Sequence, residues 1–87
     1  MTNEIKYNLH ALSDVFLSND EIKDVTILFV TLEDKNKNII SEQSIPKETL
    51  LDSLIKIFDQ DLHDVKEINV YFESENKKKL LNGISIS

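Results

Sequence analysis

Apolar residues follow first helical and then strand spacing in the first half of the chain. Four of them recur every three or four positions within residues 3–18, which predicts an amphipathic helix: Ile5, Leu9, Leu12 and Phe16. Either Thr2 or Asn3 can cap its start. Residues 24–32 (DVTILFVTL) are β-branched and aromatic and predict a strand. A polar turn cluster follows, and residues 39–45 predict a second, more polar strand.

The second half of the chain repeats this order. Pro46 suits the first turn of a helix, and Phe58 belongs to the apolar stripe that follows, so we expect Phe58 to lie beneath the sheet. Residues 65–73 predict a third strand, and the basic run NKKK is expected at a solvated hairpin tip. Three interpretations of residues 74–87 are open: a strand, a hairpin that turns at Asn82-Gly83, or a short helix over Ser74–Asn82 stopped by Gly83.

The two halves, residues 3–45 and 46–87, resemble one another and suggest an internal duplication. An offset of 40 residues places VTLEDKNK on VYFESENK and matches Val30 with Val70. The competing interpretation is that any two amphipathic helix–hairpin units look alike. Both interpretations predict one α+β domain over residues 1–87 in the order αββαββ. Its four-stranded, mainly antiparallel sheet would have the strand order 2-1-3-4, with both helices on one face.

Strand alternation divides the two central strands into a core face and an opposite face. The expected core face consists of Leu28, Val30, Leu32, Ile68, Val70 and Phe72. The opposite face is expected to leave an apolar patch in water, formed by Ile27, Phe29, Thr31 and Tyr71. Because an exposed apolar patch marks an interaction surface, these four residues are the predicted interface of a two-fold homodimer. The competing interpretation is that the first helix covers this face.

Composition and charge exclude several classes of protein. Sixteen acidic residues and ten lysines give a net charge of −6, and the chain has no arginine, so we expect no direct contact with nucleic acid. The absence of cysteine excludes disulfides and thiolate metal sites. The apolar runs are too short for a membrane span, and MTNEIKYNLH lacks the regions of a signal peptide. We therefore expect a cytoplasmic protein.

Carboxylates gather at the ends of both predicted helices: Asp20, Glu21, Asp59, Asp61 and Asp64. A carboxylate at a helix C-terminus opposes the helix dipole, which suggests that these residues serve a basic partner. The protein would then be an inhibitor, encoded by a phage or another mobile element, that mimics nucleic-acid charge and blocks a basic nucleic-acid-binding protein. The simpler interpretation is ordinary polarity at the junctions of an acidic chain.

One short segment has the side chains of a metal or catalytic site. Residues 59–64 (DQDLHD) combine three aspartates with His63, which are ligands for a hard or borderline metal. The segment lacks the glycine and the final glutamate of an EF-hand loop, and a solvated junction is the competing interpretation. Gly83 is the only glycine, so a glycine-rich phosphate loop is excluded. The leading expectation is a non-enzymatic protein-binding module that self-associates, without catalytic residues, cofactor or metal.

Overall fold

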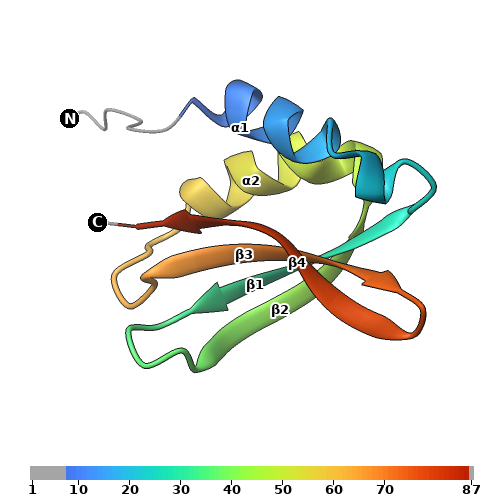
Figure 1. Ribbon diagram of the computed structural model, residues 1–87. Helices are drawn as coiled ribbons and strands as arrows, with labels where there is room; N and C mark the ends of the chain where they lie inside the picture. The colour runs from blue at the N-terminus through green and yellow to red at the C-terminus, as the bar shows by residue number, and fades with distance from the viewer. Residues whose placement is uncertain (1–7, 87) are drawn as a thin grey trace.

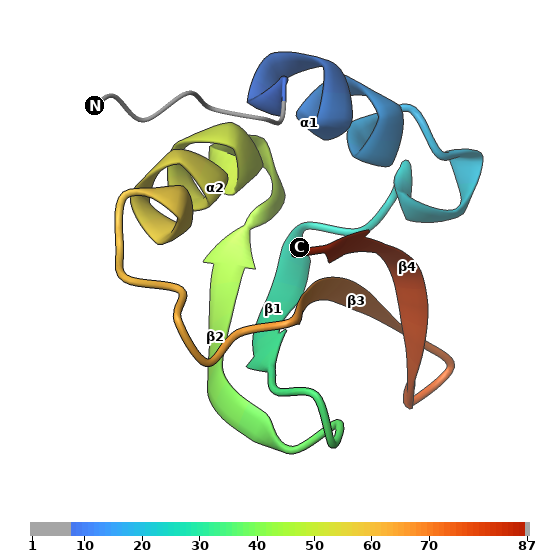
Figure 2. The same cartoon turned by 90° about the vertical axis from the view of Figure 1, so that its left-hand side faces the viewer.

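The computed structural model describes residues 8–86, in which two α-helices lie on one side of a four-stranded sheet (Figures 1 and 2). The elements follow in this order: α1 (Leu9–Leu17), the 3₁₀ helix η1 (Asp20–Ile22), β1 (Ile27–Glu33), β2 (Ile39–Pro46), the 3₁₀ helix η2 (Lys47–Thr49), α2 (Leu50–Phe58), β3 (Glu67–Ser74) and β4 (Lys77–Ser85). The strands are antiparallel, in the order β2-β1-β3-β4. The predicted α+β class, the four-stranded sheet with this strand order and the two helices are confirmed. No helix within these residues is long and apolar enough to cross a membrane.

Helix α1 is shorter than the predicted helix over residues 3–18. Asn8 has an extended backbone and caps the helix, because its Oδ1 accepts a hydrogen bond from the Ala11 backbone N–H at 3.0 Å. That bond satisfies one of the amides that a first helical turn leaves free, so the helix begins only after Asn8. The expectation that Asn8 is helical is therefore wrong. The two candidate caps, Thr2 and Asn3, and the helical residue Ile5 lie outside the described residues.

The end of the chain forms a strand. Strand β4 pairs with β3 along its length, so the proposed turn at Asn82-Gly83 and the proposed helix over residues 74–82 are both wrong. The hairpin turns instead at Glu75 and Asn76, whose φ angles of 54° and 66° fit a two-residue type I′ turn. Because the turn is this short, the three lysines after it belong to the strand and not to a hairpin tip.

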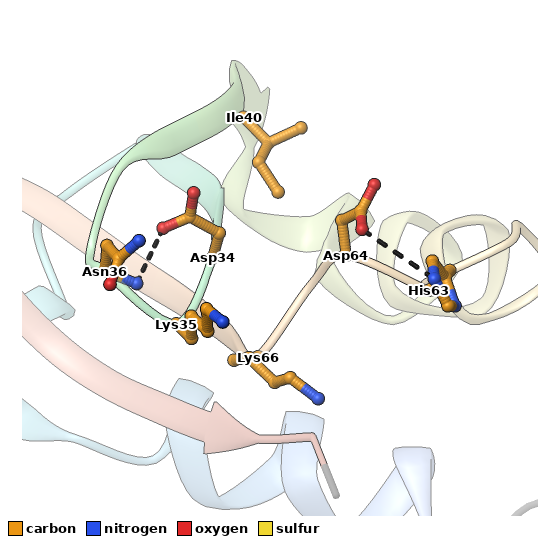
Figure 3. A pocket seen from close by; sticks show the side chains of 7 residues that line it. All are labelled: Asp34, Lys35, Asn36, Ile40, His63, Asp64 and Lys66. Atoms are coloured by element: carbon orange, nitrogen blue, oxygen red, sulfur yellow. Dashed lines mark hydrogen bonds and ion pairs between the residues drawn. The ribbon is translucent and has the colours of Figure 1, made fainter.

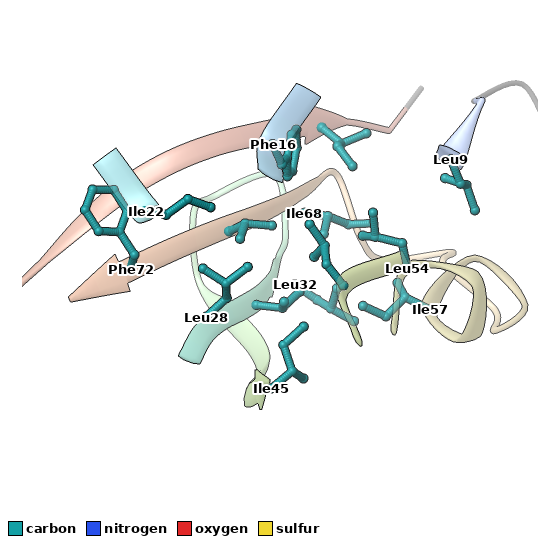
Figure 4. Packing of buried hydrophobic residues seen from close by; sticks show 14 of the residues in the cluster. Leu9, Phe16, Ile22, Leu28, Leu32, Ile45, Leu54, Ile57, Ile68 and Phe72 are labelled. Atoms are coloured by element: carbon teal, nitrogen blue, oxygen red, sulfur yellow. The ribbon is translucent and has the colours of Figure 1, made fainter. Parts of the chain in front are cut away.

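The hydrophobic core lies between the sheet and the two helices (Figure 4). The whole predicted core face of the central strands is buried: Leu28, Val30, Leu32, Ile68, Val70 and Phe72. Phe16 from α1 and Leu54 and Ile57 from α2 pack onto it. Phe58 packs against this core but is only partly buried. The buried face of α2 contains Leu54 and Ile57, and Phe58, the residue after Ile57, lies beside that face.

Candidate functional site

The open face of the sheet, on the side away from the helices, carries the predicted interface residues. Strand alternation points Ile27, Phe29 and Thr31 to this face from β1, and Tyr71 points to it from β3, directly opposite Phe29. The next residue in this row is Leu80 on β4. Ile27 and Leu80 are 41% and 56% exposed, whereas Phe29 and Tyr71 are half-buried. We refer to Ile27, Phe29, Tyr71 and Leu80 as the open-face patch.

An ion pair between the two edge strands passes over this patch. Lys78 Nζ on β4 lies 2.7 Å from Glu42 Oε2 on β2, although β1 and β3 separate the two strands. The same ammonium lies 4.4 Å from the centroid of the Phe29 ring, within the range of a cation–π interaction. Lys78 therefore covers part of a ring that the sequence predicted to stand free in water.

A buried polar network adjoins the patch. Thr31 is only 2% exposed and is not part of an exposed surface; its hydroxyl donates to Glu33 Oε2 at 2.9 Å. The Tyr71 hydroxyl donates to the same oxygen at 3.3 Å. Burial first, and then the charge of Glu33, raise the pKa of Tyr71, because both disfavour the phenolate. Two hydroxyl groups, those of Thr31 and Tyr71, thus hold the buried Glu33 carboxylate in place.

A second ion pair lies at the other end of the open face. Lys37 Nζ lies 3.0 Å from Glu67 Oε1, and Asn69 Nδ2 donates to the same oxygen at 3.4 Å. The hydrogen bond from Lys37, followed by that from Asn69, lowers the pKa of Glu67, and the same bond to Glu67 raises the pKa of Lys37. Lys37 and Glu67 thus each stabilise the charged form of the other. Two of the acids on this face are thus neutralised within the chain.

The five carboxylates predicted as an acidic partner surface lie in two separate groups. Asp20 and Glu21 belong to η1, whereas Asp59 caps the C-terminus of α2, and Asp61 and Asp64 lie in the loop before β3. Because α1 and α2 run in opposite directions, the groups lie at opposite ends of the helical layer (Figure 1). All five residues are exposed, and none pairs with a lysine among residues 8–86. The five residues therefore do not form one continuous surface.

The segment over residues 59–64 has no metal-ligand arrangement. Asp61 Oδ1 accepts the backbone N–H of His63 at 2.9 Å, and His63 Nε2 lies 4.0 Å from Asp64 Oδ1. Nowhere in the described part of the chain do three His, Asp or Glu side chains come together so that they could hold a metal ion. The aspartates of this segment instead face solvent or bind the local backbone.

His63 and Asp64 border a polar hollow of about 500 Å³ beside the turn after β1 (Figure 3). Its lining consists of Asp34, Lys35, Asn36, Ile40, His63, Asp64 and Lys66. The Asp34 carboxylate is already engaged, since its Oδ1 accepts the backbone N–H groups of Asn38 at 2.9 Å and Asn36 at 2.8 Å. The bond from Asn38, the largest cause, lowers the pKa of Asp34. The Asp34 side chain, which lines the hollow, is thus used to form the turn.

Three features of the open face were missed by the sequence analysis: the position of Glu33, the position of Leu80 and the contact between Lys78 and Glu42. Glu33 follows Thr31 by two positions on the same strand, so alternation alone could have placed it on this face. Leu80 had no such signal, because its position depends on β4 being a strand and on a register shift between Val70 and Tyr71. The Lys78–Glu42 contact joins residues 36 positions apart, which no local pattern reports.

The chain was compared with protein-family models, with curated proteins and with solved structures. None of the three comparisons found a match.

Proposed function

We propose that this protein is a small, non-enzymatic protein-binding module of the cytoplasm whose binding surface is the open face of its sheet. The observation that carries the proposal is that both helices cover the other face, which leaves Ile27 and Leu80 exposed beside the rings of Phe29 and Tyr71. An apolar group on the water-facing side of a sheet is typical of an interaction surface. The proposed occupant is a second copy of the chain, which makes the protein a homodimer.

The charges around the open-face patch favour a second copy over a basic partner. Lys78–Glu42 and Lys37–Glu67 are ion pairs within one chain, so these groups neither attract nor repel strongly across an interface. A basic partner gains little from acids that are already paired. A two-fold contact, in contrast, needs only one self-complementary patch.

The exposed apolar area predicts a weak dimer. Full burial of a large aliphatic side chain contributes about 1.5–3 kcal/mol. Ile27 and Leu80 contribute about half of this, since they are 41% and 56% exposed in one chain. Two copies of each residue supply about 3–6 kcal/mol, to which the half-buried rings add, and association itself costs several kcal/mol. The net free energy of association is then a few kcal/mol, so we expect a dimer that forms at about millimolar concentrations of protein.

Sedimentation equilibrium of three proteins tests this proposal. Phe29→Glu places a charge in the open-face patch, whereas Val15→Glu makes the same change on α1, where Val15 is 58% exposed on the helical side. The parent and Val15→Glu should associate equally strongly, and Phe29→Glu should associate clearly more weakly while it melts as a folded protein. A parent that is monomeric at high concentration refutes the proposal, as does a Phe29→Glu protein that dimerises like the parent.

A second candidate function is the acidic inhibitor of a basic nucleic-acid-binding protein. It is favoured by the exposure of all five predicted carboxylates and by their lack of lysine partners among residues 8–86. Because they lie at two ends, each end can be tested separately against polylysine as the probe. Replacing the three aspartates at 59, 61 and 64 with asparagine should slow association if that end binds. Neutralising Asp20 and Glu21 is the matched control, and unchanged binding by both variants would contradict this function.

We also propose that residues 3–45 and 46–87 arose by duplication. The strand register supports this, because Val30 lies directly opposite Val70, the residue that the 40-residue offset makes its equivalent. Antiparallel pairing centred on two equivalent residues is the pairing that a two-fold relation between the halves requires. Homologous chains whose halves align at the same offset would support the duplication, and homologues that lose this correspondence would count against it.

A further inference from the structure

The outer edge of β2 presents a row of free backbone groups. The pattern is fixed by one hydrogen bond just beyond the end of the strand pair, in which Lys47 N donates to Thr26 O at 2.8 Å. Two residues before Lys47, Ile45 lies opposite Leu28 of β1. Since backbone groups alternate along an antiparallel strand, Ser41, Gln43 and Ile45 bond to β1. The N–H and C=O groups of the residues between them, Glu42 and Ser44, therefore point outward. No other strand pairs with this edge in the part of the chain that is described.

The two edges of the sheet differ in how they are protected against strand addition. β4 carries three consecutive lysines and an irregular register in its middle, both of which discourage pairing with another strand. β2 carries no lysine, and its only charged side chain, that of Glu42, is turned across the open face to Lys78. Its irregularities lie at the two ends, a register shift beside Ile39 and a proline at position 46. The stretch between them is regular and exposed except for Ile45.

We propose that β2 pairs with β2 of a second copy of the chain, antiparallel and with Gln43 opposite Gln43. In this register the outward groups of Glu42 face those of Ser44 in the partner, and each such pair exchanges two hydrogen bonds. Centring the pair on Glu42 would oppose two carboxylates, which is unfavourable. Centring it on Ser44 would oppose Glu42 to Pro46, which has no N–H to donate. In the Gln43 register no two carboxylates are directly opposed, and Pro46 faces Ile40 at the ends of the paired stretch, outside the two central hydrogen-bonded pairs.

This contact goes beyond the proposed function, because it leaves the open-face patch free. Opposite residues of a strand pair point to the same face of the sheet, so the axis relating the two copies is perpendicular to the sheet. The result is one eight-stranded sheet with all helices on one side. The two open-face patches then lie side by side on the other. Face-to-face contact through Phe29 and edge pairing through β2 are thus separate interfaces with separate tests.

Oxidative cross-linking of Gln43→Cys tests the edge pairing. The natural chain has no cysteine, so a covalent dimer can form only through the introduced thiol. In the proposed register the two Cys side chains form a non-hydrogen-bonded pair with Cα atoms about 4.5 Å apart, within the range of a disulfide. Ser41→Cys is the matched control: it lies on the same strand and the same face, but its two copies are about 13 Å apart along the strands.

With oxidised glutathione, Gln43→Cys should cross-link at least ten times faster than Ser41→Cys at equal concentration. Adding Phe29→Glu to Gln43→Cys should leave that rate unchanged, which distinguishes the edge contact from the proposed face contact. Adding Ser44→Glu opposes two carboxylates and should slow cross-linking several-fold, whereas Ser44→Lys should not. Equal cross-linking of the two cysteine variants, or no effect of Ser44→Glu, would overturn the edge pairing even if the open-face dimer exists.

Discussion

Replacing Gly83 with alanine should destabilise the fold through a single neighbour, Asn69. The two residues lie opposite each other on β4 and β3, and a Cβ at Gly83 would lie well inside van der Waals contact with Asn69 Oδ1. Asn69 is buried, and its Nδ2 donates to Glu67 Oε1 at 3.4 Å, so it turns away only at the cost of that bond. The backbone itself accepts alanine, since Gly83 does not have a positive φ.

Two opposing contributions set the size of this effect. Overpacking a close contact costs about 1–3 kcal/mol, whereas alanine is better than glycine inside a strand by about 0.5–1 kcal/mol. We therefore expect Gly83→Ala to lower the free energy of unfolding by about 1 kcal/mol, within the range that these two contributions allow. For a domain of 87 residues, this corresponds to a fall in Tm of about 4–8 °C.

The sign of the effect should reverse when the obstacle is removed. In an Asn69→Ala background the new methyl group has space, so Gly83→Ala should be neutral or stabilise the fold by up to about 1 kcal/mol. Urea unfolding of the parent, the two single variants and the double variant gives the coupling energy of the pair. If Gly83→Ala destabilises both backgrounds equally, contact with Asn69 is not the reason and the argument is refuted.

Three further measurements follow from burial and from charge. Phe16→Ala should cost about 3–5 kcal/mol because the ring is 2% exposed, and Phe58→Ala should cost clearly less; equal losses in Tm would contradict the packing described. Folding lowers the pKa of Glu67 and the pKa of Asp34. The stability that each charged carboxylate contributes is therefore complete above its pKa in the unfolded chain, and it is lost as the pH falls through its pKa in the folded protein. Unfolding followed between about pH 5 and pH 2 should show a shallower loss in Glu67→Gln. The pKa of Lys37 is raised by folding, so the pH dependence is reversed. The stability that charged Lys37 contributes is complete below its pKa in the unfolded chain and is lost as the pH rises through its pKa in the folded protein. Lys37→Met should therefore make the loss of stability at alkaline pH shallower.

The core face and the strand order of the sheet follow from the spacing and composition of the amino acids alone. In β1 and β3 every second residue is large and apolar, and the period of two places these residues on one face of each strand, the face that packs against the helices. These strands are also the most apolar, and a strand covered by helices gains most in the middle of a sheet, which predicts the order β2-β1-β3-β4. These are local properties of spacing and composition, and the structure repeats them.

The contacts and the burial of side chains on the open face depend on how distant parts of the chain come together. The hydrogen bond from Tyr71 to Glu33 and the passage of Lys78 over Phe29 to Glu42 join residues more than 30 positions apart in the chain, and the position of Leu80 depends on the register shift between β3 and β4. The separation of the acidic residues into two groups likewise depends on the opposite directions of α1 and α2 (Figure 1). Spacing along the chain records which face a side chain points to, but not which distant side chain meets it there. The contacts between these distant side chains are set by the strand register and by the turn at Glu75 and Asn76, which places β4 beside β3.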